Sequence, residues 1–145
     1  MAAPVPNGVY AIGRPEEQLL TLQESKESVV VLPPTGQPGE QEWEVEGQSN
    51  GYVVIKNLRH GSYLGLQGPP EENQQVVGAT EAFEWVLYQA AEPQSFHVVV
   101  PGGPVYGGEE LALDLSVLHI FPPRTALRPL DVADQAQAWS FAFHE

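Results

Sequence analysis

The sequence contains no cysteine in its 145 residues. This absence excludes disulfides, zinc–thiolate sites and thiol catalysis, and it is typical of proteins that fold in a reducing compartment. Long apolar runs are missing too, since none approaches the roughly 18 residues that a membrane-spanning helix needs. Residues 1–13 lack both a basic segment and a sustained apolar one, so we expect no secretory signal and a cytoplasmic location.

Basic residues are scarce. Six Lys and Arg stand against 19 Asp and Glu, which gives a formal net charge of −13. Because nucleic acids and anionic membranes are bound through clustered Lys and Arg, we expect neither as a partner. The acidic side chains are interpreted as a solvated surface that favours solubility.

Helical periodicity is also missing. Fourteen Gly and 14 Pro divide the chain into short apolar runs, and no window of 11 or more residues follows a 3.6-residue period. The pattern predicts an all-β chain that forms a single domain over residues 1–145. We expect twelve strands, at residues 9–12, 19–22, 29–32, 42–45, 52–55, 63–66, 75–78, 83–87, 96–100, 111–115, 125–127 and 139–143.

The strands fall into three similar repeats, roughly 8–47, 51–90 and 95–145. Each repeat begins with an aromatic–aliphatic strand, continues with a Leu-x-Leu strand and closes on a tryptophan. Glutamine stands two places before the tryptophan in the first and last repeats, and Phe83 holds that place in the middle one. The shared positions are Leu20–Leu22, Leu64–Leu66 and Leu113–Leu115 for Leu-x-Leu, Trp43, Trp85 and Trp139 for the tryptophans, and Gln41 and Gln137 for the glutamines.

Three copies of a four-stranded unit that ends in Gln-x-Trp resemble the β-trefoil. The resemblance covers nearly the whole chain and implies a six-stranded barrel capped by three hairpins about a pseudo-threefold axis. A barrel closes most of its own strand edges, which suits a small chain without disulfides. The large buried area of tryptophan explains one such residue per repeat in the core.

Two mushroom families with this fold are similar to different parts of the chain. Residues 57–68, followed by Phe83-Glu-Trp85, resemble the middle repeat of a fungal ricin-B-like lectin. Residues 31–34 followed by 43–46, and residues 126–130, resemble the mushroom β-trefoil protease inhibitors. The two families imply different partners, a glycan or a protease.

The lectin resemblance implies a sugar pocket with three parts. An acidic residue near the start of the second strand accepts hydrogen bonds from sugar hydroxyls, an aromatic ring stacks on the sugar, and an Asn precedes Gln-x-Trp. In the first repeat these places hold Thr21, Pro33–Pro34 and Glu40, and in the middle repeat Gly65 replaces the acid and Phe83 the Gln. We interpret both pockets as lost.

The last repeat keeps more of the lectin pattern. Asp114 supplies the acid and Gln137 begins Gln-x-Trp, whereas Arg128 replaces the aromatic residue and Ala136 the Asn. The candidate sugar-binding residues are therefore Asp114, Arg128 and Gln137. The alternative for Asp114 is an outward-facing residue on an alternating strand.

The inhibitor resemblance implies a basic residue on the loop between the second and third strands of the first repeat. Lys26 is the single cation of residues 23–28, so the candidate inhibitory loop is Glu24, Ser25, Lys26 and Glu27. The pocket of a trypsin-like protease carries a carboxylate and selects a long cationic side chain. The alternative for Lys26 is a solvated turn residue. A fallback loop is Pro122, Pro123 and Arg124, where two prolines stiffen the chain before a cation.

An enzyme is not expected. No nucleophile elbow, zinc-protease helix, phosphate loop or calcium loop occurs, so we expect neither metal nor cofactor. His97 lies in an apolar strand and is interpreted as a structural residue with satisfied hydrogen bonds. The leading hypothesis is a non-enzymatic inhibitor of a trypsin-like serine protease that presents Lys26. The alternatives are a ricin-B-like lectin with a pocket near Asp114, and a trefoil subunit without either activity.

Overall fold

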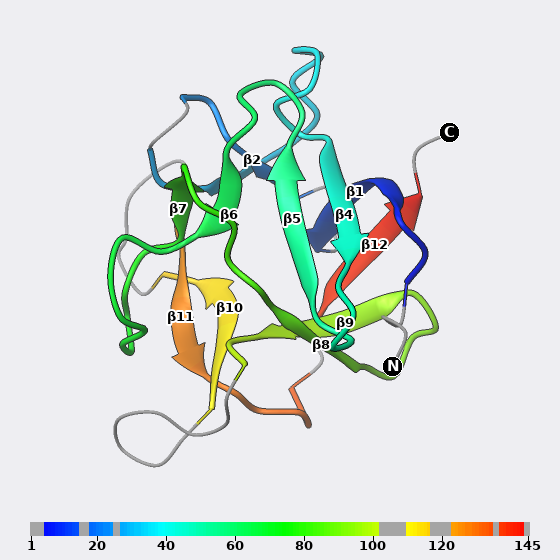
Figure 1. Ribbon diagram of the computed structural model, residues 1–145, viewed down its shortest axis with the longest axis vertical. Helices are drawn as coiled ribbons and strands as arrows, with labels where there is room; N and C mark the ends of the chain where they lie inside the picture. Colours follow the sequence, from blue (N-terminus) through cyan, green and yellow to red (C-terminus); the bar gives the residue numbers. More distant parts are fainter. Residues whose placement is uncertain are drawn as a thin grey trace.

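The computed structural model describes residues 5–14, 18–24, 27–101, 110–116, 123–134 and 137–143. These residues form twelve strands, whose arrangement is shown in Figure 1. Each lies at a place predicted from the sequence, and no helix long and apolar enough to cross a membrane occurs in these ranges. The strands are β1 (Gly8–Arg14), β2 (Gln18–Thr21), β3 (Val30–Leu32), β4 (Trp43–Gly47), β5 (Val53–Asn57), β6 (Tyr63–Gly65), β7 (Val77–Ala79), β8 (Val86–Gln89), β9 (Ser95–Val99), β10 (Leu111–Leu115), β11 (Thr125–Pro129) and β12 (Trp139–Phe143).

Six strands close into a barrel in the order β1, β4, β5, β8, β9 and β12. All neighbours are antiparallel, and β12 returns to pair with β1. Val53 and Trp85 exchange two backbone hydrogen bonds, of 2.9 and 2.8 Å, which join β5 to the residue just before β8. The ring is thereby closed, and its strands present no free edges to solvent.

The hairpins β2–β3, β6–β7 and β10–β11 form a cap whose centre repeats three times. The backbone N–H of Val29 donates to the carbonyl of Val76 at 2.8 Å, Val76 donates to Thr125 at 3.1 Å, and Thr125 donates back to Val29 at 2.9 Å. One equivalent residue from each hairpin thus joins a closed ring of backbone hydrogen bonds. This arrangement confirms the predicted β-trefoil with three pseudo-symmetric repeats.

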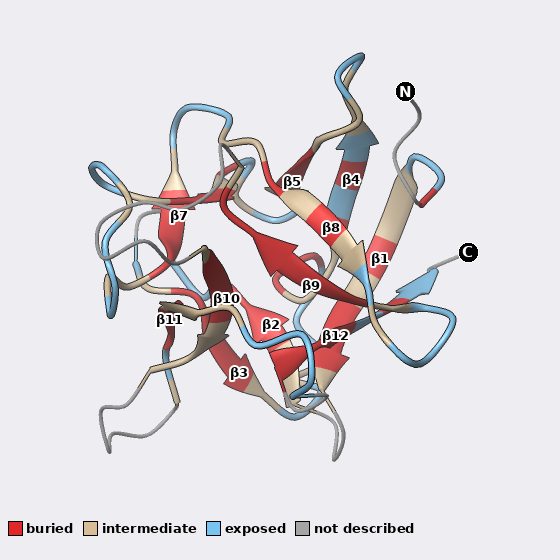
Figure 2. Cartoon of the chain, turned by 90° about the horizontal axis from the view of Figure 1, so that it is seen from below, coloured by how far each residue is buried: buried red, intermediate tan, exposed pale blue. Residues whose placement is uncertain are grey.

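The three tryptophans are fully buried and connect the barrel to the cap. Figure 2 shows buried segments in strands of both parts, such as β9 of the barrel and β10 of the cap. Each indole Nε1 donates to the carbonyl of the first leucine of the Leu-x-Leu strand in its own repeat. The bonds run from Trp43 to Leu20 at 3.0 Å, from Trp85 to Leu64 at 2.9 Å and from Trp139 to Leu113 at 2.9 Å. Since a buried indole N–H requires an acceptor, this bond fixes where each hairpin sits on the barrel.

Two strands in the middle repeat begin later than predicted. The strand expected at 75–78 corresponds to β7, which begins only at Val77. It begins late because Gln75 and Val76 pair instead with the neighbouring hairpin at residues 125–126. The strand expected at 83–87 corresponds to β8, which begins only at Val86. It begins late because the backbone N–H and carbonyl of Trp85 are hydrogen-bonded to Val53. A contact with the last repeat therefore shortens β7 at its N-terminal end, and a contact within the middle repeat shortens β8 in the same way.

The prediction that His97 has satisfied hydrogen bonds is wrong. Its side chain is buried, and neither ring nitrogen has a hydrogen-bond partner in the structure described. His97 pairs with Tyr88 across β8 and β9, but the Tyr88 hydroxyl donates to Glu110 Oε2 at 2.7 Å. The Tyr88 hydroxyl, the polar group on the residue paired with His97, therefore donates its hydrogen bond to Glu110 and not to the imidazole.

The hydrogen bond to Glu110, together with burial and the negative charge of Glu110, raises the pKa of Tyr88 to about 12. A raised pKa means that the fold favours the neutral phenol, so this contribution to stability is complete below pH 10 and is lost as the pH rises through about 12. We expect Glu110→Gln to lower the pKa of Tyr88, measured by ultraviolet absorbance titration of the phenolate. Identical titration curves for both proteins would contradict this.

Trp85→Phe should destabilise the chain by about 3 kcal/mol, because it leaves the Leu64 carbonyl without its donor and opens a void in the core. Chemical denaturation measures the free energy of unfolding. Val132→Ala, at a residue that is 61% exposed, serves as the control and should change that energy by less than about 0.5 kcal/mol. Equal effects of the two substitutions would refute the role assigned to the indole.

Candidate functional site

Asp114 and Gln137, two of the three candidate sugar-binding residues, contact each other in the third repeat. Asp114 lies on β10, where its Oδ1 accepts the backbone N–H of Leu115 at 2.7 Å and its Oδ2 accepts Gln137 Nε2 at 3.2 Å. Gln137 also donates to the carbonyl of Pro129 at 2.9 Å and accepts the N–H of Asp131 at 2.8 Å. The Asp114 side chain keeps 24% of its surface exposed, so its carboxylate is both oriented and accessible.

A cation from the first repeat lies beside this carboxylate. Arg14, at the end of β1, places its guanidinium carbon 5.7 Å from the centre of a Trp139 ring and Nη1 3.8 Å from Asp114 Oδ1. Its side chain is 14% exposed, and its buried Nε has no hydrogen-bond partner in the structure described. No role at this site was predicted for Arg14 from the sequence. The β12–β1 register, continued by one residue from Gly13 and Ser140, is the signal that would have placed it opposite Trp139.

Arg128 is not brought to Asp114. Asp114 stands opposite Ala126, so Arg128 lies on the same face of the β10–β11 hairpin. Its guanidinium is directed to the loop before β7, where Nη1 is 3.0 Å from Glu72 Oε2 and also donates to Asn73. Ala136, at the expected Asn position, lies outside the described residues.

The first repeat has the same hydrogen-bond pattern without an acid. Gln41 Nε2 donates to Thr21 Oγ1 at 3.0 Å and to the Pro33 carbonyl at 2.9 Å, and Gln41 Oε1 accepts the N–H of Thr35 at 3.0 Å. Thr21 is fully buried, and Glu40 is 6% exposed. Thr21 is therefore not accessible to a ligand, whatever its chemistry.

The middle repeat replaces the polar pair by an apolar one. A Cβ on Gly65 would lie 3.3 Å from the Cβ of Phe83 and 3.0 Å from that of Ala79, so the absence of a side chain at residue 65 lets these two residues pack closely over it. Phe83 packs edge-to-face on Trp85 with ring centres 4.8 Å apart. Gly65 and Phe83 thus occupy the places of Asp114 and Gln137.

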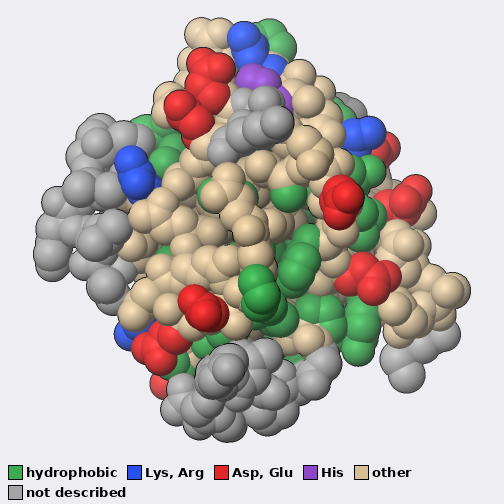
Figure 3. Space-filling model, turned by 60° about the vertical axis from the view of Figure 1, so that its left-hand side comes forward, with side chains coloured by type: hydrophobic (Ala, Val, Ile, Leu, Met, Phe, Trp, Pro, Cys, Tyr) green, Lys and Arg blue, Asp and Glu red, His purple; other side chains and the backbone are tan. Residues whose placement is uncertain are grey.

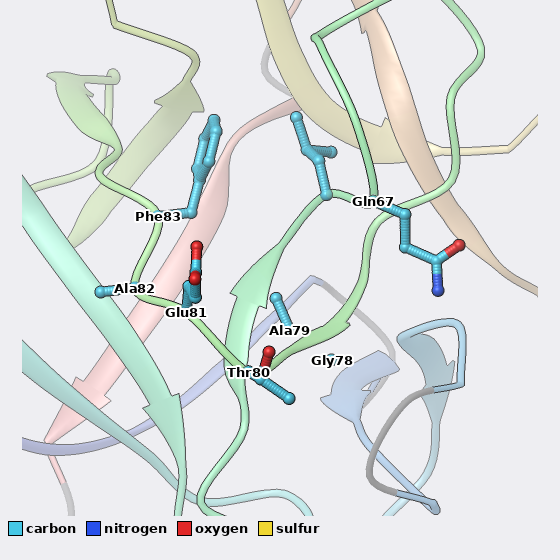
Figure 4. Close-up of a pocket in the computed structure, with 8 residues that line it drawn as sticks. Gln67, Gly78, Ala79, Thr80, Glu81, Ala82 and Phe83 are labelled. Carbon is cyan, nitrogen blue, oxygen red and sulfur yellow. The ribbon is translucent and has the colours of Figure 1, made fainter.

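A hollow of about 400 Å³ opens beside Phe83 (Figure 4). The loop that follows the third strand covers residues 33–40 in the first repeat and 130–136 in the last, but only residues 80–82 in the middle one. The hollow lies between this short loop, the end of β7 and residues 66–67 after β6. Sequence reasoning treated this pocket as lost, although the short spacing between β7 and Trp85 is a visible signal of the difference.

Of the candidate inhibitory loop, the structure describes the first and last residues, Glu24 and Glu27. Glu27 donates its backbone N–H to the Glu24 carbonyl at 3.2 Å, and the Glu27 carbonyl accepts the N–H of Gly78 at 3.0 Å. Ser25 and Lys26 lie outside the described residues. The role of Lys26 in a protease pocket stays a prediction.

The fallback loop is partly built into the cap. Pro123 accepts the N–H of Val31 at 2.9 Å through its carbonyl, and Arg124 Nη1 donates to Gln75 Oε1 at 3.3 Å. Pro122 lies outside the described residues. An inhibitory role for Pro122, Pro123 and Arg124 likewise stays a prediction.

Charges on the described surface are dispersed. Among the described side chains on the face shown in Figure 3, acidic and basic groups are interspersed and the basic ones form no continuous patch. Within the described ranges, no group of three or more His, Cys, Asp or Glu residues could hold a metal ion.

Solved structures of fungal lectins share the fold. The ricin B-like lectin of Macrolepiota procera, solved with lactose, superposes with a TM-score of 0.74 at 22% identity and covers 97% of this chain and 99% of its own. The Rhizoctonia solani agglutinin gives a TM-score of 0.79 at 18% identity and covers 97% of each chain.

Two further structures extend the comparison. The designed threefold-symmetric protein ThreeFoil matches with a TM-score of 0.77 at 14% identity, over 94% of this chain and 99% of that one. The Polyporus squamosus lectin, solved with a sialylated trisaccharide, has a TM-score of 0.72 at 18% identity, over 94% of this chain and 49% of that one. Neither a protein-family model nor a curated protein matches the sequence. At these identities the likeness establishes the fold.

A double-mutant cycle should reveal the contact between Arg14 and Asp114. Because both side chains are largely buried, Arg14→Met and Asp114→Asn should be non-additive by about 1 kcal/mol in the free energy of unfolding. The matched control is Arg128→Met with Glu72→Gln, a more exposed pair that should couple by about 0.5 kcal/mol or less. Strict additivity for Arg14 and Asp114 would show that the two groups do not interact.

Proposed function

We propose that the chain is a non-enzymatic glycan-binding protein whose sugar site lies around Asp114 in the third repeat. The observation that carries the proposal is the contact of 3.2 Å between Asp114 and Gln137, which joins the acid of the expected sugar pocket to the Gln of Gln-x-Trp. The fold likeness to fungal lectins supports the same choice. None of these comparisons supports a protease inhibitor.

The chemistry of Asp114 suits two sugar hydroxyls. An ionised carboxylate has about four acceptor positions. Two of them are used by the N–H of Leu115 and by Gln137, one on each oxygen. One position on each oxygen remains for a ligand donor, which matches a pair of neighbouring hydroxyl groups. The guanidinium group of Arg14, with Nη1 3.8 Å from Oδ1 of Asp114, partly balances the negative charge of the carboxylate.

The two other repeats lack this capacity. Thr21 is fully buried and has no charge, and Gly65 has no side chain at all. A hydroxyl-binding site of this type therefore requires the third repeat, and we infer a single sugar site in the chain. The middle repeat offers a different chemistry.

Asp114→Asn should weaken glycan binding by about tenfold to a hundredfold, because hydrogen bonds to a charged acceptor contribute about 1.5–3 kcal/mol. Lactose is the first probe, since the Macrolepiota lectin was solved with it, and a glycan array extends the search to other sugars. Binding is measured by isothermal titration calorimetry.

Glu44→Gln is the control, because it removes one negative charge from an exposed position on β4. It should leave the affinity unchanged. Absence of binding to every glycan on the array, or equal affinities of wild type and Asp114→Asn, would overturn the proposal.

A further inference from the structure

The hollow of the middle repeat has an apolar floor and a polar rim. Leu66, Ala79 and Phe83 contribute carbon surface, and Gln67, Thr80 and Glu81 contribute polar groups. Leu66 and Phe83 are partly buried and pack against the core, so the floor belongs to the rigid part of the fold. Figure 4 places Phe83 and Glu81 on one side of the hollow and Gln67 on the other, with Ala79 between them.

Glu81 gives the hollow its charge. It is the one charged residue among the eight described residues that line the hollow, and no Lys or Arg belongs to that set. Within the described part of the chain, neither a hydrogen bond nor an ion pair engages its carboxylate. The hollow therefore presents an uncompensated negative charge in a chain whose net charge is already −13.

An aromatic ring accompanies this charge. A cation is attracted to the electron-rich face of an aromatic ring, and apolar substituents on the cation strengthen the contact by burying carbon surface. Phe83 packs its ring edge-to-face with Trp85, which fixes the ring in position. A hollow lined by both a carboxylate and a fixed phenyl group is complementary to an ammonium group that bears apolar substituents.

We propose that this hollow binds a small organic cation, an ammonium group with an apolar body, between the carboxylate of Glu81 and the ring of Phe83. The neutral ends of Gln67 and Thr80 are available for a hydroxyl group of the same ligand. The volume of about 400 Å³ accommodates a ligand of this size. The inference shares no residue with the sugar site around Asp114 and does not depend on it.

Choline is the probe, and its neutral carbon analogue, in which a tert-butyl group replaces the trimethylammonium group, is the matched ligand control. In amide chemical-shift titrations of the full chain, choline should shift the resonances of residues 66–67 and 78–83. The neutral analogue should bind at least fivefold more weakly, since it has no charge to pair with Glu81.

Two variants test the residues. Glu81→Gln keeps the shape of the side chain and should weaken choline binding by about fivefold, and Phe83→Leu keeps an apolar group without a ring and should do likewise. Glu44→Gln removes the same charge at an exposed position on β4 and should leave choline binding unchanged. Amide spectra of each variant without ligand confirm that the fold is retained.

Amino sugars distinguish the source of the cation. If the site recognises ammonium groups on sugars as well, glucosamine should shift the same residues and N-acetylglucosamine, which is neutral, should not. Three results would overturn the proposal: equal binding of choline and its neutral analogue, equal binding of both sugars, or no shift in residues 66–67 and 78–83 with any cation. Loss of lactose or array binding alone would concern Asp114 and would leave this result unaffected.

Discussion

The hydrogen bond from each tryptophan indole to a leucine carbonyl holds one hairpin on the barrel, and the rest of the structure is arranged around its three copies. Trp43, Trp85 and Trp139 are fully buried, so each indole needs its acceptor, and the acceptor is supplied by the Leu-x-Leu strand of the same repeat. The cap then closes through backbone bonds among Val29, Val76 and Thr125, in which no side-chain atom takes part. The frame is therefore fixed by backbone and core, and the residues between the leucines are free to differ.

They differ in chemistry at all three places. Three positions form one set in each repeat: the residue between the two leucines, the residue two places before the tryptophan and the residue across from the tryptophan. Within each set the three residues are similar in polarity. The first set is neutral and polar, the second is apolar and the third is charged. In the second and third sets, the residue across from the tryptophan follows from continuing the strand register by one position. The sets are Thr21, Gln41 and Asn57; Gly65, Phe83 and Val100; and Asp114, Gln137 and Arg14.

Most of this frame could be predicted from the sequence, because turn residues and alternating apolar runs are local signals and the tryptophans mark each repeat. The places of Asp114 and Gln137 in the repeat also identified them as candidate residues, although their contact was not predicted. The role of Arg14 did not, since it reaches Asp114 from a strand of another repeat. The hollow beside Phe83 depends on the short loop at residues 80–82 and on the absence of a side chain at Gly65. A pattern of sugar-binding residues identifies only the missing acid at residue 65, not the space that is left there. The unsatisfied hydrogen bonds of His97 depend on the partner chosen by Tyr88, which pattern cannot reveal.

A single sugar site in a threefold frame is the central claim, and its stoichiometry tests it most directly. Isothermal titration calorimetry with a glycan that is selected from an array and carries no amino group should give one glycan bound per chain, because Asp114 is accessible, Thr21 is buried and Gly65 carries no acceptor. A stoichiometry of two or three would contradict the claim, since it would mean that repeats without an acid at the place of Asp114 bind the same neutral sugar.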